Sequence, residues 1–329
     1  MIVLQAEDVR KALPIDETIA AMKRAFASLS DGRAQVPLRA RVLIPAHDGE
    51  SLFMSAFVDD AEGEALAVKV VSVFPRNTQQ GLPILHAAVL VLEASTGRPI
   101  ALLEGGTLTA IRTGAASGAA TDLLARPDSK VAAIFGAGVQ ARTQLEAVCA
   151  VRPIQTVWIY DLIPARVESF ITEMAGKGPI PNDLRAATSP QQAAADADVI
   201  STATTSFTPV FTDADLKQGV HINGVGSYTP DMQEIPTETV SRALVVVDSR
   251  DAAFAEAGDL IRPIQQGIIS EVHIHAEIGE IVLGRKRGRM HSEQLTFFKT
   301  VGVAIQDAAA ARIALKNAQA LGLGRQMDW

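Results

Sequence analysis

The spacing of hydrophobic residues changes between the first and second halves of the chain. In the first half, Ile19, Met22, Phe26 and Leu29 recur at intervals of three and four residues, which predicts a helix over residues 14–28. Apolar runs of strand length then follow one another, at residues 38–45, 51–58, 65–74 and 85–92. Because these runs come consecutively, they predict an antiparallel or mixed sheet.

In the second half, strand-like runs alternate with helical patterns. The predicted strands cover residues 130–134, 156–161, 184–188, 198–203, 221–225 and 244–248. Helices are predicted over 140–150 and 165–174, and another begins at Ser189-Pro190, with proline at its first helical position. This alternation predicts a doubly wound parallel sheet of six strands, of the Rossmann type.

Two further segments set the domain boundaries. A helix of small residues is predicted over 109–125, followed by a linker at 126–128. A long alanine-rich helix is predicted over 296–315, where it can fold back onto the first domain. The predicted fold class is therefore α/β. Residues 126–295 form a Rossmann domain, and residues 1–125 with 296–329 form an α+β domain completed by the C-terminal helix.

A glycine-rich turn separates the first strand of the second half from the helix that follows it. Gly136 allows the tight turn, Gly138 lets the backbone approach a pyrophosphate, and Ala141 lets the helix pack closely on the strand. The pyrophosphate would lie at the positive end of the helix. The candidate cofactor contacts in this turn are Gly136, Ala137, Gly138, Val139 and Gln140.

Asp161 ends the next predicted strand, about 25 residues after the first glycine, where Rossmann domains place an acidic residue. A carboxylate there accepts hydrogen bonds from ribose hydroxyls and repels a 2′-phosphate, which favours NAD(H). Arg166 nearby leaves NADP(H) open as an alternative cofactor. Asp161 also has a simpler interpretation, as a cap of its own loop.

Short stretches of small residues follow the fourth and fifth predicted strands. They lie at the carboxyl edge of the predicted sheet, where ligands bind in such folds. Small side chains there allow the backbone to approach a nicotinamide ring. The candidate contacts are Thr202, Ala203, Thr204, Val225, Gly226 and Ser227.

Composition narrows the class of protein. The chain has 329 residues, a net charge of −7 and a pI near 5.4, which argues against a nucleic-acid-binding surface. Cys149 is the single cysteine, which excludes an internal disulfide and suits a reducing compartment. We find no signal-peptide pattern at Met1 and no apolar run of the ~20 residues that a membrane helix needs. We therefore expect a cytoplasmic protein that binds neither nucleic acid nor membrane.

Three cations in the first half have no acidic neighbour in sequence: Arg41, Lys69 and Arg112. Lys69 interrupts a strongly apolar strand, and a buried ammonium needs a partner or a ligand. Two guanidiniums and an ammonium can hold an anionic substrate such as a carboxylate. For each residue taken alone, a structural ion pair is an equally good interpretation.

With these motifs in order, the chain resembles the ornithine cyclodeaminase/mu-crystallin family over almost its whole length. The joint match is specific, whereas the glycine turn alone is not. The matching segments are Lys69 with Phe74-Pro75-Arg76-Asn77 and Gly81-Leu82-Pro83, Leu108 to Ala115, Gly136 to Ala141, His221 to Gly226, and Phe298-Lys299-Thr300-Val301-Gly302.

The resemblance implies a homodimer whose N-terminal domain, with the C-terminal helix, forms the dimer contact and the substrate pocket. It implies that Arg41, Lys69 and Arg112 hold a substrate carboxylate facing the nicotinamide, with Arg39 as a competitor for the role of Arg41. Thr113, Lys299 and Gly302 lie in the matching motifs and are further candidate cofactor contacts. No metal is expected: His273 and His275 have alternating spacing near acidic residues, but they lie in a segment that the family match already accounts for.

The resemblance also separates chemistries within the family. Cyclodeaminases place acids at the positions of Tyr228 and Leu52, so a diamine substrate would leave its ammonium unpaired here. The sequence is more similar to the ketimine reductases, which implies NAD(P)H-dependent reduction of a cyclic imino acid, such as Δ1-pyrroline-2-carboxylate or Δ1-piperideine-2-carboxylate, to an L-amino acid. Lys69 is the candidate catalytic proton donor. The alternatives are an alanine-type amino-acid dehydrogenase, ornithine cyclodeamination, and nicotinamide binding without turnover.

Overall fold

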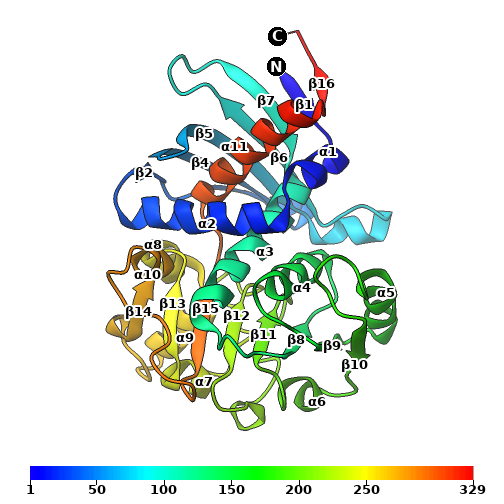
Figure 1. Cartoon of the computed structure of the whole chain (residues 1–329), viewed down its shortest axis with the longest axis vertical. Helices are drawn as coiled ribbons and strands as arrows, with labels where there is room; N and C mark the ends of the chain where they lie inside the picture. Colours follow the sequence, from blue (N-terminus) through cyan, green and yellow to red (C-terminus); the bar gives the residue numbers. More distant parts are fainter. Residues whose placement is uncertain (329) are drawn as a thin grey trace. The chain divides into compact units, whose positions relative to one another are not determined.

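The computed structural model describes residues 1–328 and consists of two compact units (Figure 1). Unit 1 comprises Met1–Arg112 and the chain from Val303, and unit 2 comprises Thr113–Gly302. The predicted boundaries, 125/126 and 295/296, differ from these limits. The first unit boundary falls within the continuous helix α3 (Gly105–Leu124), and the second follows a strand that belongs to the sheet of unit 2.

Unit 1 contains a mixed eight-stranded sheet, as the consecutive apolar runs predict. Its order is β16-β1-β7-β6-β5-β4-β2, with β3 paired to β4; β1 runs parallel to β7 and the other pairs are antiparallel. The strands are β1 (Ile2–Leu4), β2 (Ala34–Gln35), β3 (Ala40–Ile44), β4 (Gly49–Asp60), β5 (Gly63–Val73), β6 (Leu85–Leu92), β7 (Pro99–Glu104) and β16 (Arg325–Gln326). The helices of this unit are α1 (Ala6–Ala12), α2 (Ile15–Ser30), the first turns of α3, and α11 (Ala304–Leu321).

The two faces of this sheet differ in exposure. Helix α11 packs on β4 and β5, where Leu52, Met54, Ala56 and Val58 are buried at alternate positions. Most of the buried residues of α11 are alanines, whose short side chains let the helix approach the strands closely. The intervening residues point to the other face, where Phe53 stays 40% exposed and Val70 36% exposed. One face of the sheet is therefore core, and the other is an open apolar surface.

Unit 2 is a parallel α/β sheet with helices between its strands (Figure 1). Its order is β10-β9-β8-β11-β12-β15-β13-β14, and every pair is parallel. The strands are β8 (Val131–Phe135), β9 (Thr156–Tyr160), β10 (Asp183–Ala186), β11 (Val199–Thr202), β12 (His221–Gly224), β13 (Leu244–Val247), β14 (Ile274–Glu277) and β15 (Thr296–Lys299). The helices are the rest of α3, α4 (Val139–Val151), α5 (Pro164–Met174), α6 (Pro190–Ala194), α7 (Thr237–Arg242), α8 (Arg250–Glu256), α9 (Gly258–Gln265) and α10 (Ile278–Val282).

The predicted count of six strands in this sheet is wrong, because the patterns predict neither β14 nor β15. Residues 296–299 are predicted as part of the long last helix, but Thr296-Phe297-Phe298-Lys299 is a fully buried strand between β12 and β13. A turn with Gly302 at φ +80° separates this strand from α11. The strand order reverses between β8 and β11, which is where Rossmann sheets bind dinucleotides.

Candidate functional site

The glycine turn of unit 2 has the geometry that pyrophosphate binding requires. Gly136 follows β8 with φ +92°, a backbone conformation that L side chains rarely adopt, and a Cβ there would lie 2.7 Å from the carbonyl oxygen of Ala203. Gly138 is the N-cap of α4, and a Cβ there would meet nothing within 4 Å. Val139 is 70% exposed in the first turn of α4. The turn therefore leaves open space at the positive end of a 13-residue helix.

We expect the same substitution, glycine to alanine, to affect stability at Gly136 and cofactor binding at Gly138. Gly136→Ala strains the backbone and collides with Ala203, so we expect it to lower the free energy of unfolding by about 1 to 3 kcal/mol. Gly138→Ala fits the unbound turn, so we expect normal stability but NADH binding weakened at least tenfold, because a methyl group occupies the pyrophosphate's approach. Thermal melting and NADH titration of both variants measure this. Equal stability losses in the two would contradict the assignment.

Asp161 links the glycine turn to the end of β9. Its Oδ2 accepts from the backbone N–H of Ala137 at 2.8 Å, and its Oδ1 accepts from Ile163 at 2.9 Å. The carboxylate thus lies beside the glycine turn and also caps its own loop, as both interpretations of the sequence allow. Arg166 is exposed in the first turn of α5, a few residues away.

Arg142 is a contributor to the glycine turn that the sequence patterns did not reveal. Its Nη1 donates to the carbonyls of Ala137 and Gly138, at 3.0 and 2.9 Å, while its Nη2 lies 2.6 Å from a carboxylate oxygen of Glu173. It therefore supports the turn from α4. The i+4 spacing from Gly138 was the only signal of this contact in the sequence.

The two small-residue stretches lie side by side at the carboxyl edge of the sheet, after β11 and β12. Val225 donates its backbone N–H to the carbonyl of Thr202 at 3.0 Å. Glu234 connects the loop after β11 with the loop after β12. Its carboxylate accepts hydrogen bonds from Thr202, Thr204, Gly226 and Ser227. Glu234 was not predicted, because it follows β12 in an irregular segment with no periodic pattern.

Two other candidate cofactor contacts lie inside unit 2. Lys299 is fully buried, and its Nζ lies 3.0 Å from Oδ2 of Asp259, which is buried too. The sequence patterns do not indicate a role for Asp259, which the structure places in the first turn of α9 as the counter-ion of Lys299. The backbone N–H of Gly302 donates to Asp248 at 2.8 Å. A direct contact of Lys299 or Gly302 with a cofactor stays a prediction.

In unit 1, two of the three predicted substrate-binding cations lie together. Lys69 on β5 and Arg112 on α3 both pair with Asp307 of α11: Lys69 Nζ donates to Oδ1 at 2.9 Å, and Arg112 Nε donates to Oδ1 at 3.0 Å. Arg112 Nη1 also donates to Gln306 Oε1 at 2.9 Å. Lys69 and Asp307 are each 1% exposed. The trio of Lys69, Arg112 and Asp307 carries a net charge of +1 when all three are ionised, so it retains attraction for an anion.

Burial sets the protonation behaviour of Lys69. Desolvation, helped by the nearby Arg112 guanidinium, lowers the pKa of Lys69 to about 7, against the opposing effect of Asp307. A lysine with this pKa exchanges its proton near neutral pH, which is the property that a general acid needs.

Arg41, the third predicted cation, lies apart from this trio. It is on β3, half exposed, and pairs with Glu50. Arg39, its competitor, contacts the sulfur of Met54 at 4.0 Å, and Met54 lies directly opposite Lys69 in the β4–β5 register. The positive charge of Arg39 also contributes to the low pKa of Lys69. The charge of Arg39 therefore acts on Lys69, and a substrate contact of either arginine stays a prediction.

The remaining candidates lie away from these two centres or make structural contacts. Thr113 is buried on α3, next to Arg112 in sequence. His273 and His275 each direct Nε2 to a backbone carbonyl. Across residues 1–328, His, Cys, Asp and Glu side chains form no group of three that could hold a metal ion.

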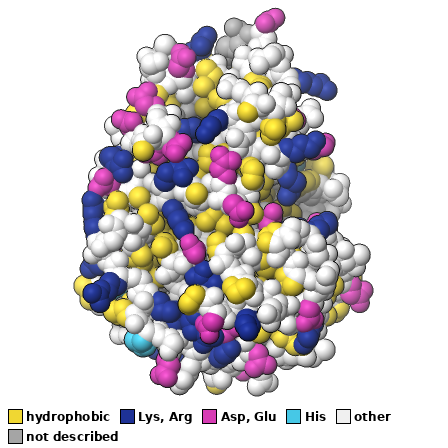
Figure 2. All heavy atoms as spheres, in the orientation of Figure 1, with side chains coloured by type: hydrophobic (Ala, Val, Ile, Leu, Met, Phe, Trp, Pro, Cys, Tyr) yellow, Lys and Arg dark blue, Asp and Glu magenta, His cyan; other side chains and the backbone are white. Residues whose placement is uncertain are grey.

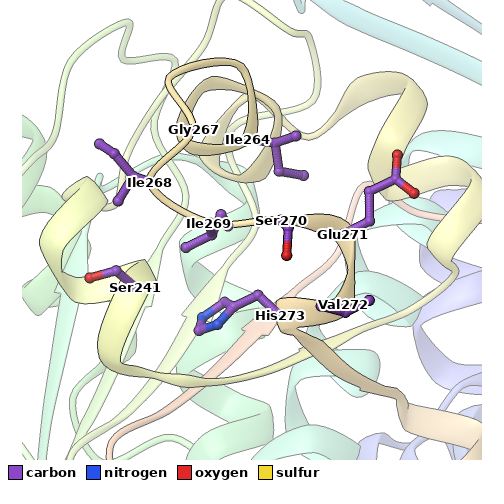
Figure 3. A pocket seen from close by; sticks show the side chains of 9 residues that line it. All are labelled: Ser241, Ile264, Gly267, Ile268, Ile269, Ser270, Glu271, Val272 and His273. Atoms are coloured by element: carbon purple, nitrogen blue, oxygen red, sulfur yellow. The ribbon is translucent and has the colours of Figure 1, made fainter.

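A surface hollow of unit 2 lies at the opposite edge of the sheet from the glycine turn. Ile268, Ser270, Val272 and His273 line it together with five neighbours, and Figure 3 shows their side chains around the opening. Its segments directly precede β13 and β14, so it lies at the amino edge. Since dinucleotides bind at the carboxyl edge, this hollow is not the cofactor site.

On the face drawn in Figure 2, basic and acidic side chains are interspersed. Among the described residues, no helix is long and apolar enough to cross a membrane.

The fold and the glycine turn define an α/β protein with a Rossmann-type dinucleotide-binding unit. Comparison with known proteins places it more narrowly: residues 1–321 match the model of the ornithine cyclodeaminase/mu-crystallin family, and the chain belongs to that family. It is 39% identical to a Δ1-pyrroline-2-carboxylate reductase of Bacillus cereus, with 100% of both chains covered.

Among the solved structures that are similar over the whole chain are two with bound nicotinamide cofactors. The Δ1-pyrroline-2-carboxylate reductase of Thermococcus litoralis, in complex with NADH and L-proline, has a TM-score of 0.95 and 44% identity, and the match covers 99% of this chain and 100% of that one. An archaeal alanine dehydrogenase dimer with bound NAD has a TM-score of 0.92 and 31% identity, covering 100% and 99%.

Proposed function

We propose that this protein reduces a cyclic ketimine carboxylate, such as Δ1-pyrroline-2-carboxylate or Δ1-piperideine-2-carboxylate, to an L-amino acid with NADH. The observation that carries the proposal is the whole-length similarity to the Thermococcus litoralis reductase, whose structure holds NADH and L-proline. The open glycine turn and the Asp161 carboxylate fit a dinucleotide. The excess positive charge of Lys69, Arg112 and Asp307 fits a substrate carboxylate.

The proposed chemistry divides between cofactor and protein. When bound, the reduced nicotinamide supplies the hydride that adds to the imine carbon. Arg112 and Arg39 orient the substrate carboxylate, and Arg41 is a further candidate for this role. Lys69 donates a proton to the imine nitrogen, becomes neutral, and regains its proton from solvent. Holding the imine in one orientation lowers the barrier further.

The test is nicotinamide oxidation followed by absorbance with Δ1-pyrroline-2-carboxylate, with NADH and NADPH supplied in turn. We expect turnover with a higher kcat/KM for NADH, because the Asp161 carboxylate repels a 2′-phosphate. Pyruvate with ammonia tests the alanine-dehydrogenase alternative, which the archaeal relative favours. Turnover with pyruvate and ammonia, but not with Δ1-pyrroline-2-carboxylate, would refute ketimine reduction in favour of an alanine dehydrogenase. Release of ammonia from ornithine would favour cyclodeamination, and cofactor binding without any turnover would favour a binding protein.

We also propose that the protein acts as a cytoplasmic homodimer formed through the open sheet face of unit 1. The archaeal relative is a dimer, and apolar residues exposed in a row on a sheet favour association. Replacing Phe53 and Val70 together by lysine is expected to give a monomer at micromolar concentration, measured by light scattering. The control is Val272→Lys, which changes a 90% exposed residue of unit 2 and should leave the dimer intact. A dimer in the double variant would refute this surface.

A further inference from the structure

Glu234 is a fully buried carboxylate that receives an unusual number of hydrogen bonds. Its Oε1 accepts from the backbone N–H and the hydroxyl of Thr204, both at 2.7 Å. Its Oε2 accepts from the Thr202 hydroxyl at 2.9 Å and from the backbone N–H groups of Gly226 and Ser227 at 2.6 and 3.2 Å. All five groups are donors, so an acceptor-only carboxylate satisfies them and an amide would not.

The five donors belong to two loops at one edge of the sheet. Thr202 and Thr204 lie at and after the end of β11, and Gly226 and Ser227 follow β12. In a Rossmann sheet the strands on one side of the reversal hold the adenine half of the dinucleotide, and those on the other side hold the nicotinamide half. The adenine side here is β8 to β10, with Asp161 after β9. The loops around Glu234 therefore belong to the nicotinamide half.

The loops close tightly around this carboxylate. A Cβ on Gly226 would lie 2.0 Å from the carbonyl oxygen of Thr204 and 2.5 Å from Glu234 Oε1. No side chain fits between them. The shape of the two loops thus depends on the group at their centre.

Glu234 is held in place by a second buried pair. Asp259 Oδ1 accepts from the backbone N–H groups of Glu234 and Ile235 at 2.7 and 2.9 Å, and Asp259 Oδ2 faces Lys299 Nζ at 3.0 Å. Burial and the Asp259 carboxylate raise the pKa of Glu234, while Lys299 and the Thr204 donors oppose that rise. Two buried carboxylates and one buried ammonium thus share this cluster.

We propose that Glu234 is a positioning residue for the nicotinamide half of the cofactor site: its carboxylate holds the loops 202–204 and 225–227 in the conformation that receives the nicotinamide riboside. The inference rests on the proposed nicotinamide-dependent function. It assigns Glu234 no contact with substrate or cofactor. Its effect reaches the cofactor through the backbone and hydroxyl groups that it orders.

Glu234→Gln tests this role, with two ligands that share the adenine half. NADH contains the nicotinamide, and ADP-ribose lacks it. We expect the Kd for NADH, measured by its fluorescence, to rise at least tenfold. The Kd for ADP-ribose, measured by calorimetry, should stay within twofold, because Asp161 and the glycine turn are unchanged. The matched control is Glu238→Gln, an exposed glutamate four residues along the chain, which should change neither value.

If Glu234 had a merely structural role, Glu234→Gln would weaken the binding of both ligands equally, and that result would overturn the inference. Unchanged NADH binding would overturn it as well. If Glu234→Gln fails to fold, Glu234→Asp keeps the charge but is too short to reach both loops. It should raise the Kd for NADH several-fold and spare ADP-ribose; binding of NADH equal to that of the unaltered protein would overturn the inference. An unaltered protein that binds NADH but reduces no ketimine refutes the proposed function alone.

Discussion

Replacing Lys69 by alanine is expected to lower kcat/KM for Δ1-pyrroline-2-carboxylate by about 10³-fold. A positioned general acid contributes roughly 10²–10⁴-fold, and Lys69 is the buried ammonium whose pKa of about 7 suits that task. Steady-state kinetics with saturating NADH measure the loss. The control is Lys316→Ala, an exposed lysine of α11 that should leave turnover unchanged. Turnover of Lys69→Ala within a few-fold of the unaltered protein would end the proposed role.

The pH profile adds an independent check. Because the pKa of Lys69 is lowered to about 7, its protonated form declines as pH rises above 7. We therefore expect kcat/KM to fall above about pH 7. Lys69→Arg keeps a permanent positive charge, so any residual activity should lose this inflection. An inflection at the same pH in Lys69→Arg would assign it to another group.

Asp307→Asn is expected to produce the largest loss of stability, about 3 to 5 kcal/mol in the free energy of unfolding. Removing one partner of a buried ion pair leaves the other charge uncompensated, and here two cations, Lys69 and Arg112, depend on one carboxylate. Urea unfolding measures the change. Asp59→Asn, an exposed change on β4, should cost far less.

A compensating variant separates charge from packing. Replacing Lys69 by methionine and Asp307 by leucine removes both members of the pair, and an apolar pair of similar volume is often no less stable than a buried ion pair. We expect this double variant to regain only part of the stability that Asp307→Asn loses, because the buried Arg112 guanidinium still lacks its carboxylate, and to remain inactive. Failure to regain stability would mean that Asp307 acts through Arg112 and Gln306 rather than through Lys69.

The elements that could be predicted from the sequence are those whose pattern lies within a short contiguous stretch of residues. The strand at residues 85–92 was predicted with its observed limits, because its turn signals and apolar run are contiguous. The glycine turn between a strand and a helix was likewise recognised from contiguous residues. Residues 296–299 were wrongly predicted as helix. These four strand residues lie next to a long alanine-rich run, and they are too few to show a strand pattern of their own beside the pattern of that helix.

The polar contacts of the site were beyond prediction for a different reason. Lys69 and Asp307 are 238 residues apart in the sequence. Hydrophobic periodicity predicts which face of a helix or strand a residue lies on, but it does not predict which distant residue it contacts. Sequence reasoning showed that Lys69 needed a partner or a ligand, without identifying Asp307 as that partner. Asp259 had no role for the same reason: its partner Lys299 lies on a strand that was predicted as helix.

The discontinuity of unit 1 affects the order in which the protein is made. Helix α11 supplies the cover of β4 and β5 and the Asp307 carboxylate that pairs with Lys69, but it is translated after the whole of unit 2. Before α11 is made, the face of the unit 1 sheet that α11 will cover is therefore exposed, and Lys69 lacks the Asp307 counter-charge. At the same stage, unit 2 already has all of its strands. Synthesis should complete the nucleotide-binding unit first and the other unit last, so that a chain interrupted before residue 303 retains one folded unit and exposes an apolar sheet for chaperones to bind.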